Sequence, residues 1–293
     1  MKILVLGKNG QLAQALAARN SDKLAIVALG REACDLLRPD SIAAALAREA
    51  PNAVINAAAY TAVDKAESEP DAAMALNAVA PGAMAAACAA RGTPFVHVST
   101  DYVFDGLKTS PYVETDPIAP QSVYGRTKAE GEAAVTHAGG EAAILRTSWV
   151  YASTGANFVR TMLRLAATRE ELGVVADQLG RPTWARDLAD ACLASAIALA
   201  NRDAAARGVF HYGGAGDATW ADFADAIFAE AAKRGMPSAR VNRITTADYP
   251  TPAKRPANSR LATTKIEAAL GLRARPWREA LALCMDEIAA QPA

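Results

Sequence analysis

The sequence predicts an α/β protein, with a doubly wound parallel sheet followed by a smaller α/β domain. In its first half, short apolar runs alternate with alanine-rich segments at helical spacing. The apolar runs show no polar alternation, which is typical of strands buried on both faces. Strands and helices in strict alternation indicate a parallel sheet. The 293 residues, 52% of them hydrophobic, are enough for a sizeable core.

The elements follow from Gly, Pro and polar boundaries around each run. Strands are expected at 2–6, 25–29, 53–56, 94–98 and 142–146, with helices at 11–19, 40–50, 71–90 and 122–135. Residues 72–90 carry no charge and are long enough to cross a membrane. They are mostly alanine and contain Asn77, Pro81 and Gly82, so a buried helix is the better interpretation.

The second half is less regular, and a domain boundary is expected near residue 150. Helices are predicted at 157–169, 187–200, 221–233 and 278–290, with one strand at 208–212. Pro and Gly cluster at 213–216 and 249–256, where loops are expected. Residues 151–293 would then form mainly a separate domain, although later segments can return to the first one.

Charge and cysteine usage exclude several classes of protein. The 31 basic residues balance 31 acidic ones without a dense basic stripe, which argues against a nucleic-acid partner. The four cysteines are far apart, with no C-x-x-C pair, as in a reduced cytoplasmic protein. The apolar run at 1–6 is too short for a signal peptide, and the three scattered histidines do not suggest a metal site. We therefore expect a cytoplasmic protein without a membrane partner.

A glycine-containing turn joins the first strand to the first helix. In Gly7-Lys-Asn-Gly10-Gln-Leu-Ala13, Gly7 permits a tight turn and Gly10 lets the backbone approach a pyrophosphate. Ala13 allows the helix to pack closely on the strand, with phosphates at the helix N-terminus. The G-x-x-G-x-x-A spacing differs from G-x-G-x-x-G, so an ordinary strand–helix turn is the alternative. We interpret residues 1–150 as a dinucleotide-binding Rossmann domain.

The end of the second strand bears on the choice of cofactor. An acidic residue there would bind the ribose 2′-OH of NAD, but this chain has Gly30-Arg31. A guanidinium suits a 2′-phosphate and favours NADPH over NADH, unless Arg31 is an ordinary surface arginine. Asp35 and Leu36, a few residues on, are candidates for contact with the adenine.

Three further residues indicate carbonyl chemistry. Tyr124 and Lys128 are four apart on a predicted helix and share one face. An ammonium close to the phenol lowers the tyrosine pKa from about 10 towards neutrality, as a general acid facing a ketone requires. Thr100, at the end of the fourth strand, could hydrogen-bond the same carbonyl oxygen. A Y-x-x-x-K pair alone is weak evidence, but here it follows the glycine turn and Thr100 along the chain, which favours a functional role.

This combination resembles the extended short-chain dehydrogenase/reductase superfamily, and within it the dTDP-4-dehydrorhamnose reductase family. The resemblance covers nearly the whole chain, including its second half. It rests on Asn-Ala-Ala-Ala-Tyr-Thr-Ala-Val-Asp-Lys-Ala-Glu at 56–67, Ser-Thr-Asp-Tyr-Val-Phe-Asp-Gly at 99–106, Tyr-Gly-Arg-Thr-Lys at 124–128, Arg-Thr-Ser-Trp-Val-Tyr at 146–151 and Tyr-Pro-Thr-Pro-Ala-Lys-Arg-Pro at 249–256.

The resemblance implies reduction of the C4 ketone of dTDP-4-dehydro-β-L-rhamnose by NADPH or NADH, the last step of dTDP-L-rhamnose synthesis, which supplies lipopolysaccharide and O-antigen. Tyr124 would donate the proton, Lys128 would hold the nicotinamide ribose and Thr100 would orient the carbonyl. The resemblance also implies contacts of Gly10, Gln11 and Leu12 with the pyrophosphate, of Asp35 and Leu36 with the adenine, of Ala59, Tyr60 and Thr61 with the middle of the cofactor, of Thr100, Asp101 and Trp149 with the sugar, and of Arg255, Asn258 and Ser259 with the nucleotide diphosphate.

One departure concerns a magnesium ion that bridges dimers in some members of the family. At the matching positions this chain has Ala15 and Arg186, and only Glu287 could still bind a cation. We therefore expect no bridging metal and a monomer or weak homodimer.

Two other functions fit parts of the pattern. A 4-epimerase or dehydratase on the same fold would keep its dinucleotide tightly bound, whereas a reductase releases it. A non-catalytic relative serves as the regulatory subunit of methionine adenosyltransferase, but a regulator has no need of intact Thr100, Tyr124 and Lys128.

Overall fold

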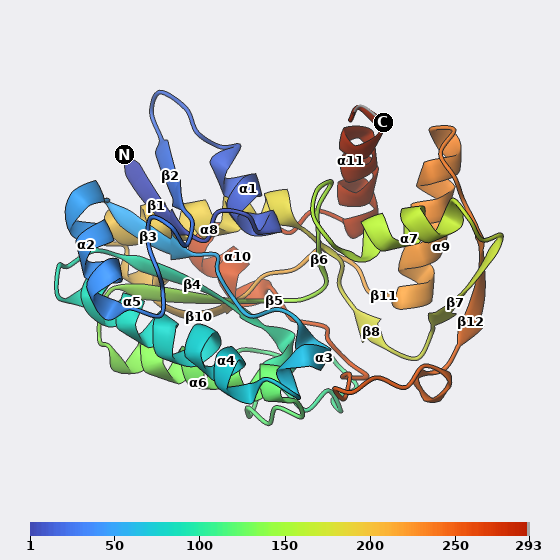
Figure 1. The fold of residues 1–293 in the computed structure, drawn as a ribbon, viewed down its shortest axis with the longest axis horizontal. Helices are drawn as coiled ribbons and strands as arrows, with labels where there is room; N and C mark the ends of the chain where they lie inside the picture. Colours follow the sequence, from blue (N-terminus) through green and yellow to red (C-terminus); the bar gives the residue numbers. More distant parts are fainter. Residues whose placement is uncertain (292–293) are drawn as a thin grey trace.

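A parallel sheet forms the centre of the first half, as the sequence predicts, and it has six strands because one strand of the second half joins it (Figure 1). The computed structural model describes residues 1–291. The strand order is β10-β5-β4-β3-β1-β2, and every neighbouring pair is parallel. The strands are β1 (Lys2–Leu6), β2 (Ala25–Leu29), β3 (Ala53–Asn56), β4 (Phe95–Thr100), β5 (Ala142–Thr147) and β10 (Gly208–His211).

Helices cover both faces of this sheet because its central strands are apolar on both sides. Ile3 and Val5 pack on α1 (Gln11–Ala17) and α8 (Ala185–Ala200). On the same face, α10 (Thr264–Leu270) adds Ile266 to this apolar cluster. Leu4 and Leu6 face α2 (Pro39–Glu49) and α5 (Ala80–Ala89), with α6 (Val123–His137) beside α5. The doubly wound arrangement is confirmed.

The helix expected over 71–90 is not continuous. After α3 (Val63–Ala66), it consists of α4 (Pro70–Met74), the π-helical η1 (Ala75–Val79) and α5. In η1 the buried Asn77 side chain accepts from Tyr60 N at 2.8 Å and donates to Thr127 Oγ1 at 3.1 Å. Pro70–Ala89 is the one helical stretch of the described chain that is long and apolar enough to cross a membrane, and 44% of the window tested is buried. It packs on α2 and α6, as a core helix does.

The second half builds a separate lobe from helices and two-stranded sheets (Figure 1). β7 (Glu171–Val175) pairs with β12 (Arg240–Ile244), β6 (Val150–Tyr151) with β9 (Thr183–Trp184), and β8 (Leu179–Gly180) with β11 (Ala218–Thr219). Its apolar core lies among α7 (Phe158–Ala166), α9 (Trp220–Lys233) and α11 (Trp277–Ala289). The remaining short helices are η2 (Asp101–Val103), η3 (Ala204–Ala206) and η4 (Thr246–Asp248).

Part of the second half returns to the first lobe. β10 extends the central sheet beside β5, and α8 packs against α1 and strands β3, β4 and β5. The chain therefore crosses between the lobes more than once, and the division near residue 150 stays a prediction.

Candidate active site

A cavity of about 820 Å³ opens at the carboxyl ends of the parallel strands. Ligands of doubly wound sheets bind at this edge, because the loops after the strands meet there. The cavity brings together fifteen of the eighteen residues that the sequence marks as site candidates: Gly7, Gly10, Gln11, Leu12, Arg31, Asp35, Leu36, Ala59, Tyr60, Thr61, Thr100, Asp101, Tyr124, Lys128 and Trp149.

The glycine turn has the geometry that a dinucleotide phosphate requires. Gly7 has φ +103°, and a Cβ there would lie 3.0 Å from Ala58 N, so only glycine fits. Gly10 is the N-cap of α1, with no capping side chain and no acidic residue in the first turn. The backbone N–H groups of that turn remain available to an anion at the cavity wall.

The end of β2 differs in one respect from what the sequence suggests. Arg31 lines the cavity and is exposed, and within residues 1–291 it forms no ion pair. However, the neighbouring Glu32 brings Oε2 to 3.0 Å from the place of a Cβ on Gly30. A carboxylate therefore does lie at this strand end, because the turn folds Glu32 back over the glycine. Asp35 and Leu36 line the cavity beside them, as expected for an adenine pocket.

Thr100 and Tyr124 meet across the contact of η2 with α6. Ser122 caps α6 by accepting from Gly125 N at 3.1 Å, which places Tyr124 in the first turn. A Cβ on Gly125 would lie 2.2 Å from Tyr102 O, so glycine permits the close approach of α6 to η2. Burial raises the pKa of the Tyr124 phenol, although its hydrogen bond with Thr100 opposes the rise.

The expected effect of Lys128 on that phenol is wrong in this structure. Lys128 Nζ donates to Val98 O at 2.6 Å and lies 3.4 Å from His97 Nε2. Besides burial and Thr100, the groups that shift the pKa of Tyr124 are Asp101 and Tyr102, which both raise it. Burial lowers the pKa of Lys128 itself to about 8. Tyr124 therefore stays protonated at neutral pH, as a proton donor must.

Asp101 is a buried carboxyl in the cavity wall. Thr100 Oγ1 donates to its Oδ1 at 3.1 Å. Burial raises its pKa to about 6, against the opposing effect of the Ser259 and Thr100 hydroxyls. Four buried side-chain atoms of the wall lack hydrogen-bond partners among the described residues, which is typical of a surface prepared for a ligand: Gln11 Oε1, Ser99 Oγ, Asp101 Oδ2 and Thr147 Oγ1.

Trp149 is held in an uncommon conformation at the boundary between the lobes. Its φ is +50°, and its ring stacks on Trp220 with centroids 3.6 Å apart. A Cβ on Gly180 would lie 2.2 Å from the Trp149 ring. The indole thus occupies space that only a glycine in β8 leaves free.

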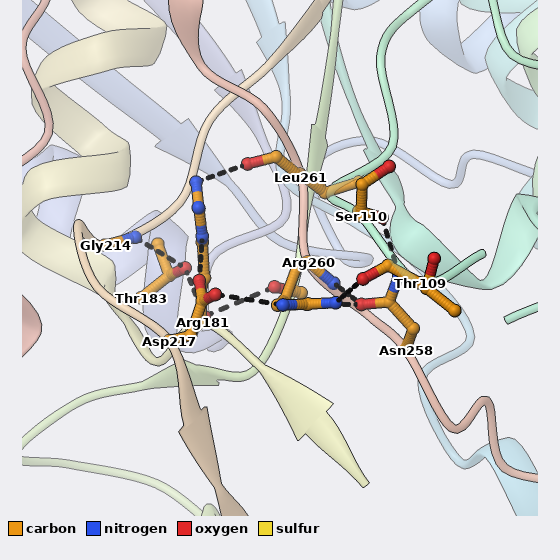
Figure 2. Close-up of polar contacts among 10 residues, drawn as sticks. Thr109, Ser110, Arg181, Thr183, Gly214, Asp217, Asn258, Arg260 and Leu261 are labelled. Carbon is orange, nitrogen blue, oxygen red and sulfur yellow. Dashed lines mark hydrogen bonds and ion pairs between the residues drawn. The ribbon is translucent and has the colours of Figure 1, made fainter. Parts of the chain in front are cut away.

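The structure does not bring Arg255, Asn258 or Ser259 to the cavity wall. Arg255 donates to the Tyr102 hydroxyl at 3.0 Å and to Asp64 Oδ2 at 2.6 Å. The Asn258 amide donates to Lys108 O at 2.6 Å and Ser110 O at 2.9 Å. Figure 2 shows Asn258 directed at this loop and next to Arg260, whose guanidinium shares Asp217 with that of Arg181. Both side chains are thus engaged within the protein, and their contact with substrate stays a prediction.

Sequence reasoning missed several residues of the site. Asn56, at the end of β3, lines the cavity, as do Ser148 and the loop segment at 155–156. His97 lies behind the wall on β4. A polar residue inside an otherwise apolar strand was the available signal for Asn56 and His97. Ser148 directly follows β5, so its place at a strand end was a signal too, whereas nothing in the local sequence marks 155–156.

The residues at the expected metal position do not fit a divalent cation. Arg186 Nε pairs with Glu287 Oε1 at 2.7 Å, and Ser153 Oγ donates to the other oxygen of Glu287 at 2.7 Å. A guanidinium repels a cation, and Ala15 offers no oxygen. Residues 1–291 contain no group of three or more His, Cys, Asp or Glu side chains suited to a metal ion.

Comparison with known proteins agrees with this geometry. The family described as RmlD substrate binding domain matches residues 1–290. The dTDP-4-dehydrorhamnose reductase of Burkholderia thailandensis is 48% identical, covering 99% of this chain and 100% of that protein. That of Escherichia coli K12 is 43% identical, covering 98% of each.

Solved structures agree as well. The Bacillus anthracis dTDP-4-dehydrorhamnose reductase in complex with NADP is 32% identical, with a TM-score of 0.90 over 98% of this chain and 99% of that one. A Thermus thermophilus UDP-glucose 4-epimerase, 22% identical with a TM-score of 0.78 over all of both chains, shares the fold alone. The chain therefore belongs to the dTDP-4-dehydrorhamnose reductase family of the extended short-chain dehydrogenases/reductases.

Proposed function

We propose that this protein reduces dTDP-4-dehydro-β-L-rhamnose to dTDP-β-L-rhamnose, the last step of dTDP-L-rhamnose synthesis. The observation that carries the proposal is the convergence of Thr100, Tyr124 and Lys128 on one cavity with the glycine turn. Two relatives that are 48% and 43% identical to this chain over nearly its whole length are named dTDP-4-dehydrorhamnose reductase.

NADPH is the cofactor that the site supports best. The Gly7–Gly10 turn and the start of α1 would hold the pyrophosphate, together with Gln11 and Leu12. Arg31, free of other ion pairs in the described chain, would bind the 2′-phosphate. The relative from Bacillus anthracis was solved with NADP. Asp35 and Leu36 would contact the adenine, and Ala59, Tyr60 and Thr61 the middle of the cofactor.

The chain's residues supply the proton and the orientation. When bound, the reduced nicotinamide supplies a hydride to C4. Tyr124 would give its phenolic proton to the carbonyl oxygen, so that hydride and proton together make the alcohol. The Thr100 hydroxyl would hydrogen-bond the same oxygen, and Lys128 would bind the nicotinamide ribose. Asp101 and Trp149 would contact the sugar, and movement of the loop around 255–259 would bring Arg255, Asn258 and Ser259 to the nucleotide.

The organisation of the whole protein is part of the proposal. Residues 151–293 would mainly bind the dTDP-sugar, apart from α8, β10 and α10, which pack with the first lobe. The Arg186–Glu287 pair favours a protein that is monomeric or weakly dimeric without a metal bridge. We infer a cytoplasmic location and no nucleic-acid partner from the composition.

The direct test is the loss of reduced-nicotinamide absorbance with the keto sugar generated in situ, with NADPH and with NADH. Oxidation that depends on the sugar supports the reductase. A folded protein that oxidises neither cofactor contradicts it. Dinucleotide retained through purification would then favour an epimerase, and copurification with a synthetase would favour a regulatory subunit.

A further inference from the structure

The aromatic rings of the second lobe extend from its apolar core to the cavity wall. Phe158 on α7 lies against Trp220, the first residue of α9, with ring centroids 4.6 Å apart. Trp220 also stacks on Trp149, at 3.6 Å and with the ring planes 12° apart. Trp149 belongs to the cavity wall, whereas Trp220 does not. Trp220 therefore connects a cavity residue to the aromatic core of the lobe.

The conformation of Trp149 needs support from its surroundings. Its φ of +50° is in the left-handed region, which bulky residues rarely adopt and which persists only where neighbouring groups enforce it. Thr183 N donates to Trp149 O at 3.1 Å and holds the backbone. Gly180 leaves room for the indole but has no side chain to hold it. The stack on Trp220 therefore sets the plane of the Trp149 ring.

A buried glutamine holds Trp220 in turn. Gln178 immediately precedes β8 and is 7% exposed. Its Oε1 accepts from Trp220 Nε1 at 3.2 Å, and its Nε2 donates to Thr246 Oγ1 at 3.0 Å. An indole N–H can only donate, so the amide must turn its oxygen to Trp220 and its NH₂ to Thr246. Both ends of the amide are engaged, and its orientation is fixed.

The chain of hydrogen bonds ends at a carboxylate. Thr246 Oγ1 donates to Asp177 Oδ1 at 2.7 Å, and Thr246 N donates to the same carboxylate at 3.0 Å. Burial opposes the ionisation of Asp177, but the bonds from Thr246, with one from its own backbone, hold its pKa below the ordinary value. The charged carboxylate can only accept, so the Thr246 hydroxyl gives its proton to Asp177 and a lone pair to Gln178. Each bond from Trp220 to Asp177 thus has one possible direction.

We propose that Gln178 and Trp220 are positioning residues for the sugar: Gln178 fixes the Trp220 ring, and this ring fixes the plane of the Trp149 indole in the cavity wall. The inference rests on the proposed function, in which Trp149 contacts the sugar. A side chain that is free to rotate must be ordered when the sugar binds, whereas an indole already held by a stack avoids this cost. Trp149 therefore binds the sugar more tightly because two residues outside the cavity hold it in place.

The first test compares two ligands that differ by the sugar. Gln178→Met nearly preserves the length of the side chain and removes both of its hydrogen bonds. The affinity for dTDP-β-L-rhamnose should fall by about two- to tenfold, the cost of ordering one side chain on binding. dTDP, which lacks the sugar, should bind as before, and calorimetry measures both. Equal losses for the two ligands, or no loss for either, would overturn the proposal.

The second test separates binding from turnover. In the reductase assay, Gln178→Met should raise the KM for the keto sugar at an almost unchanged kcat, because the lost contact serves ground state and transition state alike. Thr246→Val removes the hydroxyl that supports Gln178, and Thr246→Ser keeps it. The KM should rise in the first variant and be restored in the second. A fall in kcat alone, or equal KM values in the two Thr246 variants, would contradict the chain of hydrogen bonds.

The third test reads the rings without any ligand. The full-length chain has four tryptophans, and Trp149→Phe and Trp220→Phe assign two of the indole N–H signals in ¹H–¹⁵N spectra. In Gln178→Met both signals should shift, because Trp220 loses its acceptor and Trp149 changes its place in the ring current of Trp220. The signals of Trp184 and Trp277 should stay. A Trp149 signal that does not follow the Trp220 signal would refute the coupling.

Failure of the proposed function has a different signature. A protein with the expected shifts in Gln178→Met that neither binds the dTDP-sugar nor reduces the keto sugar would refute the reductase and the role of the sugar here. The support of the Trp149 indole by Trp220 and Gln178 would stand.

Discussion

Tyr124 keeps its proton at neutral pH because burial raises the pKa of its phenol. Tyr124→Phe removes the proton donor but keeps the ring, so turnover should fall by about 10²–10⁴-fold. Binding of NADPH, followed by fluorescence, should change little, since the ring still fills its place beside Tyr102. Near-normal turnover with the keto sugar would exclude Tyr124 as the acid.

Asp101 makes the stability of the protein depend on pH. Its pKa rises from 3.8 in the unfolded chain to about 6 in the folded one, so the folded state binds the proton more tightly. The stability that this proton contributes is present below about pH 4 and is lost as the pH rises through 6. Asp101→Asn should therefore add about 3 kcal/mol to the free energy of unfolding at pH 8, relative to the original protein.

Urea unfolding of both proteins at pH 4 and pH 8 checks this expectation. The difference between them should vanish at pH 4, where both side chains are uncharged. An equal difference at the two pH values would mean that the gain comes from packing rather than from the buried charge.

Arg31 and Glu32, at the end of β2, should have opposite effects on the preference for NADPH over NADH. Arg31→Ala should lower kcat/KM with NADPH by about tenfold or more, since an ion pair to a phosphate is lost, and change NADH little. Glu32→Gln should improve NADPH relative to NADH, because a carboxylate beside Gly30 repels a 2′-phosphate. Initial rates with both cofactors measure this. An equal fall in kcat/KM with NADPH and with NADH in Arg31→Ala would show that the guanidinium does not bind the 2′-phosphate.

The sequence was sufficient to predict fifteen of the residues that line the cavity, but not their ionisation. Thr100, Tyr124 and Lys128 were found because strand ends and helix spacing place them on one face. The raised pKa of Tyr124 could not be found, because it depends on how closely α6 packs on η2, whose Tyr102 lies against the ring. The contacts of Lys128 with Val98 and His97 likewise come from the packing of α6 on β4.

β8 controls the position of Trp149 through one glycine. Gly180→Ala would place a Cβ 2.2 Å from the indole, which the stack on Trp220 prevents from moving freely. We expect a higher KM for the sugar, with NADPH binding unchanged. Gly173→Ala in β7 is the matched control, since its Cβ meets only Ile244 at an ordinary 3.5 Å. Similar kinetics in the two variants would show that Trp149 is not positioned by this contact.

Elements with strong apolar runs could be predicted within a residue or two. β1, β2 and β3 match the expected ranges, and β4 and β5 differ at their ends. The π-helical turn of η1 could not be predicted. The buried Asn77 is stabilised there by hydrogen bonds to Tyr60 and Thr127, which are distant in the sequence. The paired strands of the second lobe were also missed. Several are two residues long, and β12 is too polar to resemble a buried strand.

At the scale of the whole molecule, Arg186 affects whether two copies of the protein can dimerise through a magnesium ion. Its pair with Glu287, together with the Ser153 hydroxyl, engages both carboxylate oxygens that a bridging cation would need. Sedimentation velocity should therefore give the same mass with magnesium and with EDTA. A dimer that forms only with magnesium would refute this expectation, and Arg186→Glu supplies a protein in which one carboxylate is restored for comparison.

The return of β10 to the central sheet also affects how the chain folds during its synthesis on the ribosome. A ribosome releases the chain from its N-terminus, and domains generally fold as units during synthesis. The edge of β5 and the faces covered by α8 stay open until residues 185–211 have emerged, well after the last strand of the first half. The nascent first lobe must therefore remain incomplete, with apolar strands uncovered, while much of the second lobe is still being translated. A chain arrested at residue 150 should bind chaperones that hold exposed apolar strands, and one arrested after β10 and α8 have emerged should release them.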